Sequence, residues 1–348
     1  MKAVLLKGPG RIEIAESPEP VCPSDGLILE IKACGLCGGD VRAYSFGNSV
    51  PGGAEIMGHE ITGVVSQVGR EARGYLPGDR LAFAADIRCG GCHYCRSGLP
   101  NLCENLQILG KHVNGGFVER MTVTAEVLRH GIVNPLPDDL SFVQGALSEP
   151  FCSILSSHDY LGVGFGQTVV VIGAGPMGCL HAALAKVRGA FAVILSEKSP
   201  GRIEVAKKAL TGLGIEVFIN PDEVDLEDFI RESTRGLGAD VAIVACAVPE
   251  MAGAAVRMVK KRGVVGIFGG FPEGRDQLKI DGNILHYGEI RIVGNFSYHP
   301  SYHRLSLQAL AGRIINPDRF ITVYPLAQLG QAVLDAREGR ILKAVLVP

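Results

Sequence analysis

The sequence has 348 residues, of which 47% are hydrophobic and 20% are charged, and its formal net charge is -2. This length is sufficient for two domains, each with its own core. The small net charge gives no electrostatic basis for binding nucleic acid or an anionic membrane, and no apolar run approaches the roughly 20 residues that span a bilayer. Because the first residues also lack the apolar segment and cleavage site of a signal peptide, a cytoplasmic protein is expected.

Residues 1–150 are rich in glycine and proline and contain short runs of alternating character. Leu27–Lys32 and Ile61–Val68 are examples of such runs. This pattern is typical of twisted β structure with many turns, and no long amphipathic helix is evident. A mainly β domain is therefore expected here.

Four of the ten cysteines are crowded into fifteen residues, at Cys89, Cys92, Cys95 and Cys103. In a long chain without a signal segment, this spacing indicates metal binding rather than disulfides. Four thiolates without an open position are typical of a structural zinc site. An iron–sulfur cluster is the alternative, but Glu104 follows the last cysteine where such clusters usually have a proline. We expect a structural zinc lobe over residues 86–106.

From about residue 151, strand-like runs alternate with helical patterns, which predicts a doubly wound parallel sheet. The expected strands are Val169–Ile172, Ala192–Leu195, Val217–Ile219, Val241–Val244, Val264–Phe268 and Ile290–Val293. The expected helices include Arg202–Leu210, Leu226–Thr234 and Met251–Lys260.

The chain ends with a helix at about 302–313, a strand at Ile321–Val323, a helix at about 326–337 and the apolar strand Lys343–Val347. We expect the last strand to return to the sheet of the first domain. The predicted domains are therefore 1–150 with 296–348, and 151–295.

A glycine motif follows the first strand of the second domain. Its residues are Gly173, Gly175, Pro176, Met177 and Gly178, in the spacing G-x-G-x-x-G, and the segment 179–188 reads as a helix. The first glycine allows the turn, the second lets the backbone approach a pyrophosphate, and the third lets helix and strand pack closely. The helix N-terminus then presents N–H groups and a positive dipole end to the phosphates. The motif predicts dinucleotide binding.

The next strand ends at Ser196 and Glu197, where an acidic residue would bind the adenosine ribose hydroxyls and repel a 2′-phosphate. This favours NAD over NADP, although Ser196, Lys198 and Arg202 together could favour NADP. Arg202 is expected beside the adenine or on the helix surface, and Phe268 beside the nicotinamide.

Three other places in the sequence carry residue types that bind metals. Cys37 lies in a glycine-rich turn, His59 and Glu60 precede a strand, and Glu149 lies where the two domains should meet. Each also has an ordinary structural explanation: a buried thiol, a hydrogen-bonded loop histidine, or a solvated or helix-capping carboxylate.

Taken together, these motifs resemble the zinc-dependent medium-chain dehydrogenases, in the polyol (sorbitol-type) and threonine dehydrogenase branch. The resemblance covers essentially the whole chain. It implies a GroES-like catalytic domain and a Rossmann domain, with a catalytic zinc in the cleft between them and a second, structural zinc. Cys37 and His59 would hold the catalytic zinc with either Glu60 or Glu149. Further matching segments are 74–80, 98–103, 115–119, 136–142 and 146–150.

The implied function is oxidation of a secondary alcohol of a polyol or sugar-derived substrate, with hydride transfer to NAD⁺. Zinc acts as a Lewis acid that lowers the pKa of the substrate hydroxyl. A threonine dehydrogenase and a sugar-phosphate dehydrogenase are alternatives, and a non-catalytic cofactor-binding scaffold is an alternative of another class. The family also implies a homodimer or homotetramer.

Three positions depart from the pattern of the relatives. Gly39 stands where relatives carry a serine or threonine hydroxyl, and Arg42 where many carry histidine. Ser297-Tyr298 replaces an Arg-Tyr pair that contacts substrate in polyol dehydrogenases. The proton path therefore stays open, and Arg42 could be a surface residue or a contact for an acidic or phosphorylated substrate.

Overall fold

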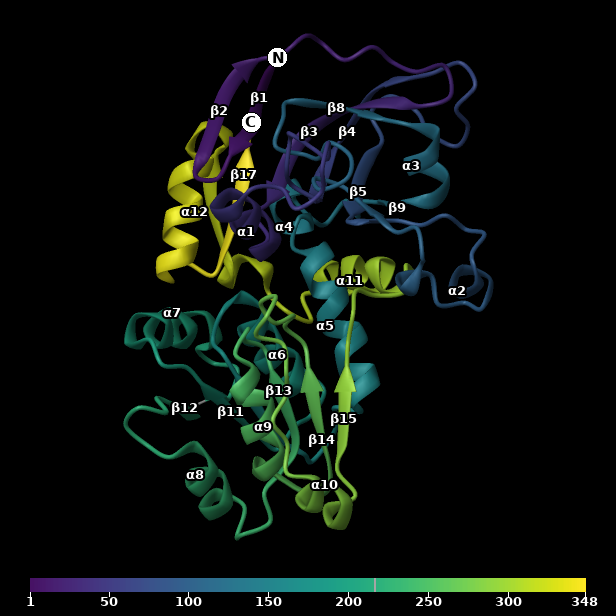
Figure 1. The fold of residues 1–348 in the computed structure, drawn as a ribbon. Coiled ribbons are helices and arrows are strands. Elements are labelled where there is room, and N and C mark those ends of the chain that lie inside the picture. The colour runs from purple at the N-terminus through teal and green to yellow at the C-terminus, as the bar shows by residue number, and fades with distance from the viewer. Residues whose placement is uncertain (216) are drawn as a thin grey trace. The chain divides into compact units, whose positions relative to one another are not determined.

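The computed structural model describes residues 1–215 and 217–348 (Figure 1). The chain divides into two compact units, Met1–Cys152 with Tyr298–Pro348, and Ser153–Ser297. In the described part of the chain, no helix has the length and apolar character needed to cross a bilayer. The assignment of one unit to zinc and the other to the cofactor stays a prediction.

The first unit is built around a mixed β-sheet and two short two-stranded sheets. Its strands are β1 (Lys2–Gly8), β2 (Arg11–Glu16), β3 (Leu27–Gly35), β4 (Glu60–Val68), β5 (Arg80–Ala84), β6 (Asp86–Ile87), β7 (Gln107–Ile108), β8 (Arg120–Val123), β9 (Ile132–Pro135), β16 (Ile321–Pro325) and β17 (Lys343–Val347). Over the described residues the main sheet has the order β16-β17-β3-β4-β5-β9, with β8 paired to β3. The last strand, β17, pairs with β3, so the expected return of the C-terminus to this sheet is confirmed.

The first unit also contains short helical segments, and two helices that were not expected from the sequence begin close to candidate ligands. Residues 38–46 form a helix where a turn was expected, and another helix begins at Ser148 and carries Glu149 in its first turn. The helical segments are α1 (Gly38–Phe46), α2 (His93–Arg96), η1 (Pro100–Leu102), α3 (Ala125–His130), α4 (Phe142–Gly145), α11 (Ser301–Ala311), η2 (Pro317–Arg319), η3 (Leu326–Gln328), α12 (Leu329–Glu338) and the start of α5 (Ser148–Leu161), which belongs to the second unit from Ser153 onward.

The second unit is a doubly wound parallel sheet, as expected. Its strands are β10 (Thr168–Ile172), β11 (Ala192–Ser196), β12 (Val217–Ile219), β13 (Ala239–Val244), β14 (Val259–Ile267) and β15 (Arg291–Gly294). Its helices are α6 (Pro176–Val187), α7 (Pro200–Leu210), α8 (Leu226–Ser233), α9 (Pro249–Met258) and α10 (Gly282–Gly288). Within the described residues, six parallel strands have the order β12-β11-β10-β13-β14-β15, which corresponds to the 3-2-1-4-5-6 order of Rossmann folds.

One boundary in this unit differs from the expectation. The helix expected over Met251–Lys260 ends at Met258, and β14 starts at Val259 rather than Val264. Val259 pairs with Ala239 of β13, so ladder hydrogen bonds draw the residues after Met258 into the sheet. A valine at this position also favours a strand over a helix, because its branched side chain is restricted in a helix.

The register of β3 and β4 determines which residues meet at the end of this strand pair. The strands are antiparallel, and their last pairs are Cys34 with Ile61 and Gly35 with Glu60. The end of β3 and the start of β4 therefore lie at the same edge of the sheet. Cys37 follows the end of β3, and His59 precedes the start of β4. As a result, these two residues lie next to each other at this edge of the sheet.

Candidate metal centre and cofactor site

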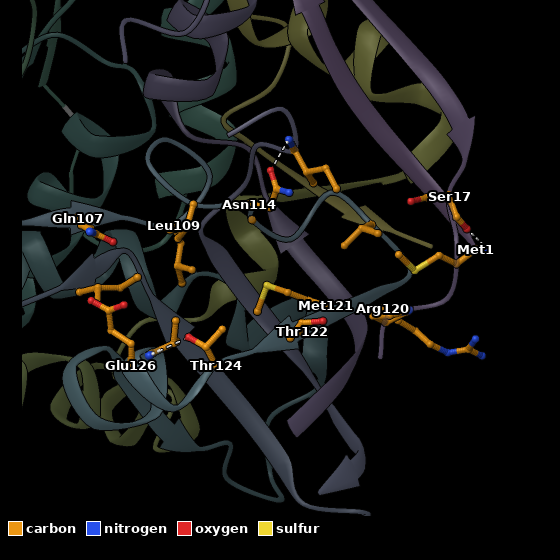
Figure 2. Close-up of a pocket in the computed structure, with 17 residues that line it drawn as sticks. Met1, Ser17, Gln107, Leu109, Asn114, Arg120, Met121, Thr122, Thr124 and Glu126 are labelled. Atoms are coloured by element: carbon orange, nitrogen blue, oxygen red, sulfur yellow. Dashed lines mark hydrogen bonds between the residues drawn. The ribbon is translucent and has the colours of Figure 1, made fainter. Parts of the chain in front are cut away.

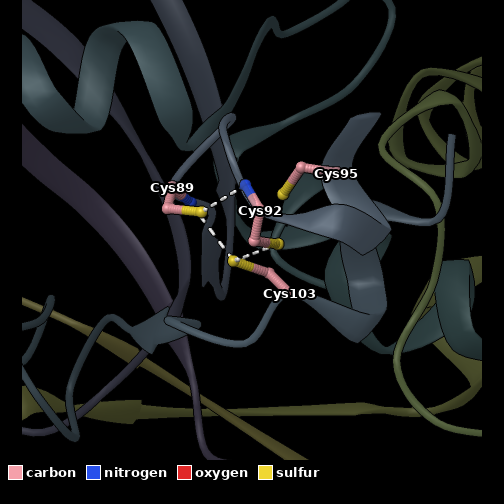
Figure 3. A group of neighbouring side chains, drawn as sticks. All are labelled: Cys89, Cys92, Cys95 and Cys103. Atoms are coloured by element: carbon pink, nitrogen blue, oxygen red, sulfur yellow. Dashed lines mark hydrogen bonds between the residues drawn. The ribbon is translucent and has the colours of Figure 1, made fainter. Parts of the chain in front are cut away.

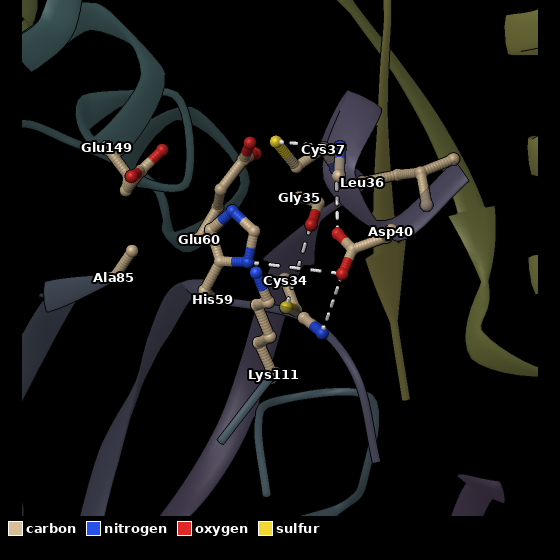
Figure 4. Close-up of polar contacts among 12 residues, drawn as sticks. Cys34, Gly35, Leu36, Cys37, Asp40, His59, Glu60, Ala85, Lys111 and Glu149 are labelled. Atoms are coloured by element: carbon tan, nitrogen blue, oxygen red, sulfur yellow. Dashed lines mark hydrogen bonds and ion pairs between the residues drawn. The ribbon is translucent and has the colours of Figure 1, made fainter. Parts of the chain in front are cut away.

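The structure brings Cys37, His59 and Glu60 together in the first unit (Figure 4). One ligand atom from each residue lies within 4.8 Å of the other two. A thiolate, an imidazole and a carboxylate are the ligand types that hold catalytic zinc in proteins.

Asp40 fixes the loops that carry the thiol and the imidazole. Cys37 is the N-cap of α1, and its backbone N–H donates to Asp40 Oδ2 at 2.9 Å. The other oxygen of Asp40 accepts from the backbone N–H of Gly58 at 3.2 Å and lies 3.9 Å from His59 Nδ1. One buried carboxylate thus ties the start of α1 to the residues that precede β4.

Glu60 is completely buried, and its two oxygens have different surroundings. Oε1 is paired with the buried ammonium of Lys343, which also donates to the backbone carbonyl of Leu36 at 2.9 Å. Oε2 has no hydrogen-bond partner among the described residues. A Cβ at Gly35 would overlap this oxygen, so only glycine leaves room for the carboxylate here. A buried carboxylate oxygen without a protein partner, beside a thiol and an imidazole, fits a metal ligand.

The charges in this group also fit a cation. Burial raises the pKa of Glu60 to about 7, although the ammonium of Lys343 acts in the opposite direction. Burial opposes protonation of His59, but the negative charges of Cys37 and Asp40 outweigh it, so the pKa of His59 is raised well above its usual value. Zn²⁺ among these ligands would offset the negative charge that the thiolate and carboxylates place in a buried site.

Glu149, the alternative third ligand, is not a member of this group within the described residues. Its side chain is buried, and its Oε1 accepts a 2.5 Å hydrogen bond from the hydroxyl of Tyr298. The backbone N–H of Ala85 in turn donates to the same hydroxyl at 3.4 Å. Of the two glutamates left open by the sequence, Glu60 is therefore the one that lies with the thiol and the imidazole.

The four clustered cysteines form a second metal-type group (Figure 3). None of them is in a disulfide. Cys89 Sγ accepts from the backbone N–H of Cys92 at 3.3 Å, and Cys103 Sγ accepts from the N–H of Cys89 at the same distance. The backbone N–H groups of Gly91 and Cys92 lower the pKa of Cys89 to about 6. Four converging sulfurs with N–H groups directed at them fit a structural zinc held by thiolates.

The glycine motif has the backbone geometry that dinucleotide binding needs. Gly173 has a φ of +106°, which favours glycine. A side chain at Gly178 would overlap the carbonyl oxygen of Gly173, whereas nothing lies within 4 Å of a Cβ placed at Gly175. Helix α6 starts at Pro176, and no side chain caps its N-terminus. Met177, in the first turn, completes the expected motif.

Glu197 lies beside this turn, although it is 23 residues from it in sequence. Its Oε2 accepts from the backbone N–H of Ala174 at 3.0 Å, and its Oε1 accepts from the N–H of Ser199, also at 3.0 Å. Arg202 lies in α7, and its backbone N–H is bound by the Ser199 side chain. Phe268 follows β14, and its ring packs edge-on against that of His181, with 4.4 Å between the ring centres.

Three residues that shape the metal group are not marked as functional by the sequence. From the sequence alone, Lys343 is only the first residue of the closing strand, Asp40 is only one residue of the glycine-rich turn that contains Cys37, and Tyr298 is only part of a replaced pair. No local pattern marks Lys343, because it reaches Glu60 through the pairing of β17 with β3. For Asp40, the spacing of three residues from Cys37 is a capping signal that could have indicated the helix.

Two of the cavities in the first unit differ in their position relative to the expected ligands. The first has a volume of about 320 Å³, lies between the N-terminus and β8 (Figure 2), and is not lined by any of the expected ligand residues in the part of the chain described. The second has a volume of about 520 Å³ and is lined by His59, Gly39 and Asp40 among others. The second cavity therefore gives access to the imidazole of the metal group.

Comparisons with known proteins identify the family of this chain. Residues 23–138 match the alcohol dehydrogenase GroES-like domain, and residues 176–312 match the zinc-binding dehydrogenase domain. The chain is 30% identical to the sorbitol dehydrogenase of Bacillus subtilis over 100% of its own length and 97% of the relative. It is also 30% identical to the L-threonine 3-dehydrogenase of Pyrococcus horikoshii, over 92% of this chain and 90% of that protein.

A solved structure supports the same assignment. A zinc-binding dehydrogenase of Sinorhizobium meliloti 1021, bound to NADP, superposes with a TM-score of 0.88 at 29% identity and covers 100% of this chain and 99% of its own. The GroES-like first domain and the Rossmann second domain expected from the sequence are thus confirmed. The chain belongs to the zinc-binding alcohol dehydrogenase family.

Proposed function

We propose that this protein oxidises a secondary alcohol of a polyol or sugar-derived substrate and transfers the hydride to NAD⁺. The observation that carries the proposal is the meeting of Cys37, His59 and Glu60, with one buried Glu60 oxygen that has no partner among the described residues. These three residues would hold the catalytic zinc. When bound, the metal supplies Lewis acidity, which makes the substrate hydroxyl acidic enough to lose its proton near neutral pH.

The protein's own groups keep these ligands in position. Asp40 holds the backbone of Cys37 and the residue before His59, while Lys343 fixes one oxygen of Glu60 and leaves the other available. Gly39 has no hydroxyl to receive the substrate proton. With one oxygen paired to Lys343 and the other assigned to the metal, Glu60 has no free oxygen to take over this role.

We propose NAD rather than NADP because of the position of Glu197. Its carboxylate lies at the glycine turn, where it would accept hydrogen bonds from ribose hydroxyls and repel a 2′-phosphate. Lys198, which could favour NADP, is paired with Asp222 at 3.0 Å. One similar structure contains NADP, so this assignment depends on Glu197 itself.

Metal analysis and a substrate screen test the proposal together. We expect two zinc ions per chain, one of which a chelator removes with loss of activity. The zinc-loaded protein is then assayed with NAD⁺ on sorbitol, galactitol, inositols, their phosphates and L-threonine. Reduction of NAD⁺ with a polyol or polyol phosphate supports the proposal, and a preference for L-threonine would replace it with a threonine dehydrogenase. One tightly held zinc and no turnover would favour a non-catalytic scaffold.

A further inference from the structure

The cavity beside His59 carries positive charge that the proposed chemistry does not use. It lies entirely in the first unit, and its wall includes α1, residues 46–49 and the turn after β7. Arg42 and Lys111 both line it. The inference below concerns the substrate of this site and so rests on the proposed function.

Both cationic side chains are exposed, and neither has a hydrogen bond or ion pair within residues 1–215 and 217–348. Many other cations of this protein do have carboxylate partners, such as Lys207 with Glu204 at 2.9 Å and Arg257 with Glu227 at 2.8 Å. Two unpaired cations on the wall of one cavity make it attractive to an anion.

The single acidic residue in the described lining does not neutralise them. Asp40 is only 3% exposed. Its two carboxylate oxygens accept from the backbone N–H groups of Cys37 and Gly58, and it lies beside His59. The carboxylate of Asp40 is thus already bound within the metal group. It does not pair with Arg42 or Lys111, whose charges line the cavity.

The backbone of Lys111 is fixed relative to His59. Its carbonyl accepts from Asn48 Nδ2 at 2.9 Å and from the N–H of Ala54 at 3.0 Å. The preceding residue, Gly110, has a φ of +72° and packs so closely on Gly58 that a Cβ would lie 2.7 Å from the Gly58 nitrogen. In Figure 4 the Lys111 side chain extends toward His59.

The position of Arg42 is set by the helix that carries it. It lies in α1, the helix whose N-cap is the metal-type residue Cys37. Both cations are therefore carried by segments that also position a proposed zinc ligand. Two positive charges match the charge of about -1.5 to -2 that a phosphate ester carries at pH 7.

We propose that Arg42 and Lys111 bind a phosphate ester on the substrate, so that the protein acts on a phosphorylated polyol whose hydroxyl lies at the metal group. Charge-assisted hydrogen bonds from the guanidinium and the ammonium select the phosphorylated molecule over the neutral polyol. The cavity volume of about 520 Å³ is in the range of small-molecule sites.

Substrate pairs that differ only in the phosphate test this directly. We expect kcat/KM with NAD⁺ to be at least about tenfold higher for galactitol 1-phosphate, sorbitol 6-phosphate or arabitol 5-phosphate than for the parent polyol. The ratio of kcat/KM for the phosphorylated polyol to kcat/KM for the parent polyol should fall about tenfold or more in Lys111→Gln and in Arg42→Gln. Lys111→Arg, which keeps the positive charge, should retain most of the native ratio. The control Lys208→Gln removes an exposed lysine of α7 and should leave the ratio unchanged. Equal or better use of the neutral polyols by the native protein would overturn the proposal.

The cofactor also carries phosphate groups, which the two cations could bind in place of a substrate phosphate. The KM for NAD⁺ distinguishes these two possibilities. If Lys111→Gln and Arg42→Gln raise the KM for NAD⁺ and leave the ratio between phosphorylated and neutral substrates unchanged, the cations serve the cofactor diphosphate and the proposal is wrong.

A binding measurement tests the anion site without depending on turnover. Zinc-loaded protein saturated with NADH is titrated calorimetrically with glycerol 3-phosphate and with glycerol. We expect the phosphate to bind at least about tenfold more tightly, and Lys111→Gln to remove this difference. This result would support the anion site even if no alcohol were oxidised and the proposed function failed. Equally weak binding of both compounds would overturn it.

Discussion

Lys343 and Glu60 form a buried ion pair between two strands that are 283 residues apart in sequence. Both side chains are almost inaccessible, at 4% and 0% exposure. The lysine satisfies one carboxylate oxygen and leaves the second directed at Cys37 and His59. A carboxylate that belongs to the proposed metal group is therefore positioned by the last strand of the chain.

Removing the lysine should destabilise the first unit strongly. In Lys343→Met, Glu60 stays buried without its charge partner, and we expect a loss of about 3 kcal/mol or more in the free energy of unfolding. The measurement is urea unfolding of the zinc-free protein. Lys343→Arg, which keeps the charge, and Lys343→Met with Glu60→Gln, which removes both charges, should each lose less. A double variant as unstable as Lys343→Met alone would show that the pair is not the cause.

Replacing the thiol tests the metal group. We expect Cys37→Ser to abolish turnover, to lower the zinc content from two ions to one, and to leave NAD⁺ binding within severalfold. The reason is that the serine hydroxyl is a poor substitute for a thiolate ligand, while the glycine motif lies in the other unit. Turnover, elemental analysis and cofactor titration give the three readouts. The control Cys22→Ser changes a thiol outside the group, and normal turnover in Cys37→Ser would refute the assignment.

The preference between cofactors should depend on Glu197. Glu197→Ala removes the proposed partner of the ribose hydroxyls and the charge that repels a 2′-phosphate, so NAD⁺ binding should weaken more than NADP⁺ binding. A change of about tenfold in the ratio of the two KM values is expected for one charge-assisted interaction. The KM values are measured with the same alcohol. Equal weakening for both cofactors would count against the NAD assignment.

Stability of the second unit should fall in mild acid because of His181. Burial lowers the pKa of this histidine to about 3, and its Nδ1 lies 3.0 Å from Nε2 of His158, whose pKa burial also lowers. The unfolded chain, with an ordinary histidine pKa near 6.5, binds more protons than the folded chain between about pH 6.5 and 3. The stabilisation is therefore present above about pH 6.5 and is lost as the pH falls, by about 1.4 kcal/mol per pH unit for each histidine.

Urea unfolding at pH 7, 6 and 5 checks this expectation. The slope of unfolding free energy against pH should be smaller in His181→Gln than in the native protein. His286→Gln, which removes an exposed histidine, should keep the native slope. An unchanged slope in His181→Gln would mean that other groups cause the acid sensitivity.

Local patterns in the sequence were enough to predict the second unit and the four-cysteine group. The apolar strand before Gly173 and the G-x-G-x-x-G spacing predict β10, the turn and α6, because strand, turn and helix depend on neighbouring residues. The four cysteines are similarly informative, since a short loop can fold around one ion. The end of the helix at Met258 was not predictable in this way, because pairing with β13 decides it.

Tertiary structure decided which ligand-type residues meet and what holds them. The sequence alone left Glu60 and Glu149 as equal candidates, and the antiparallel register of β3 and β4 brings Glu60 to Cys37 and His59. Lys343 and Lys111 reach this site only through long-range pairing and close packing, which no local pattern encodes. The sequence thus determined which chemical groups the protein has available, and the packing of distant segments determined which of them share one buried space.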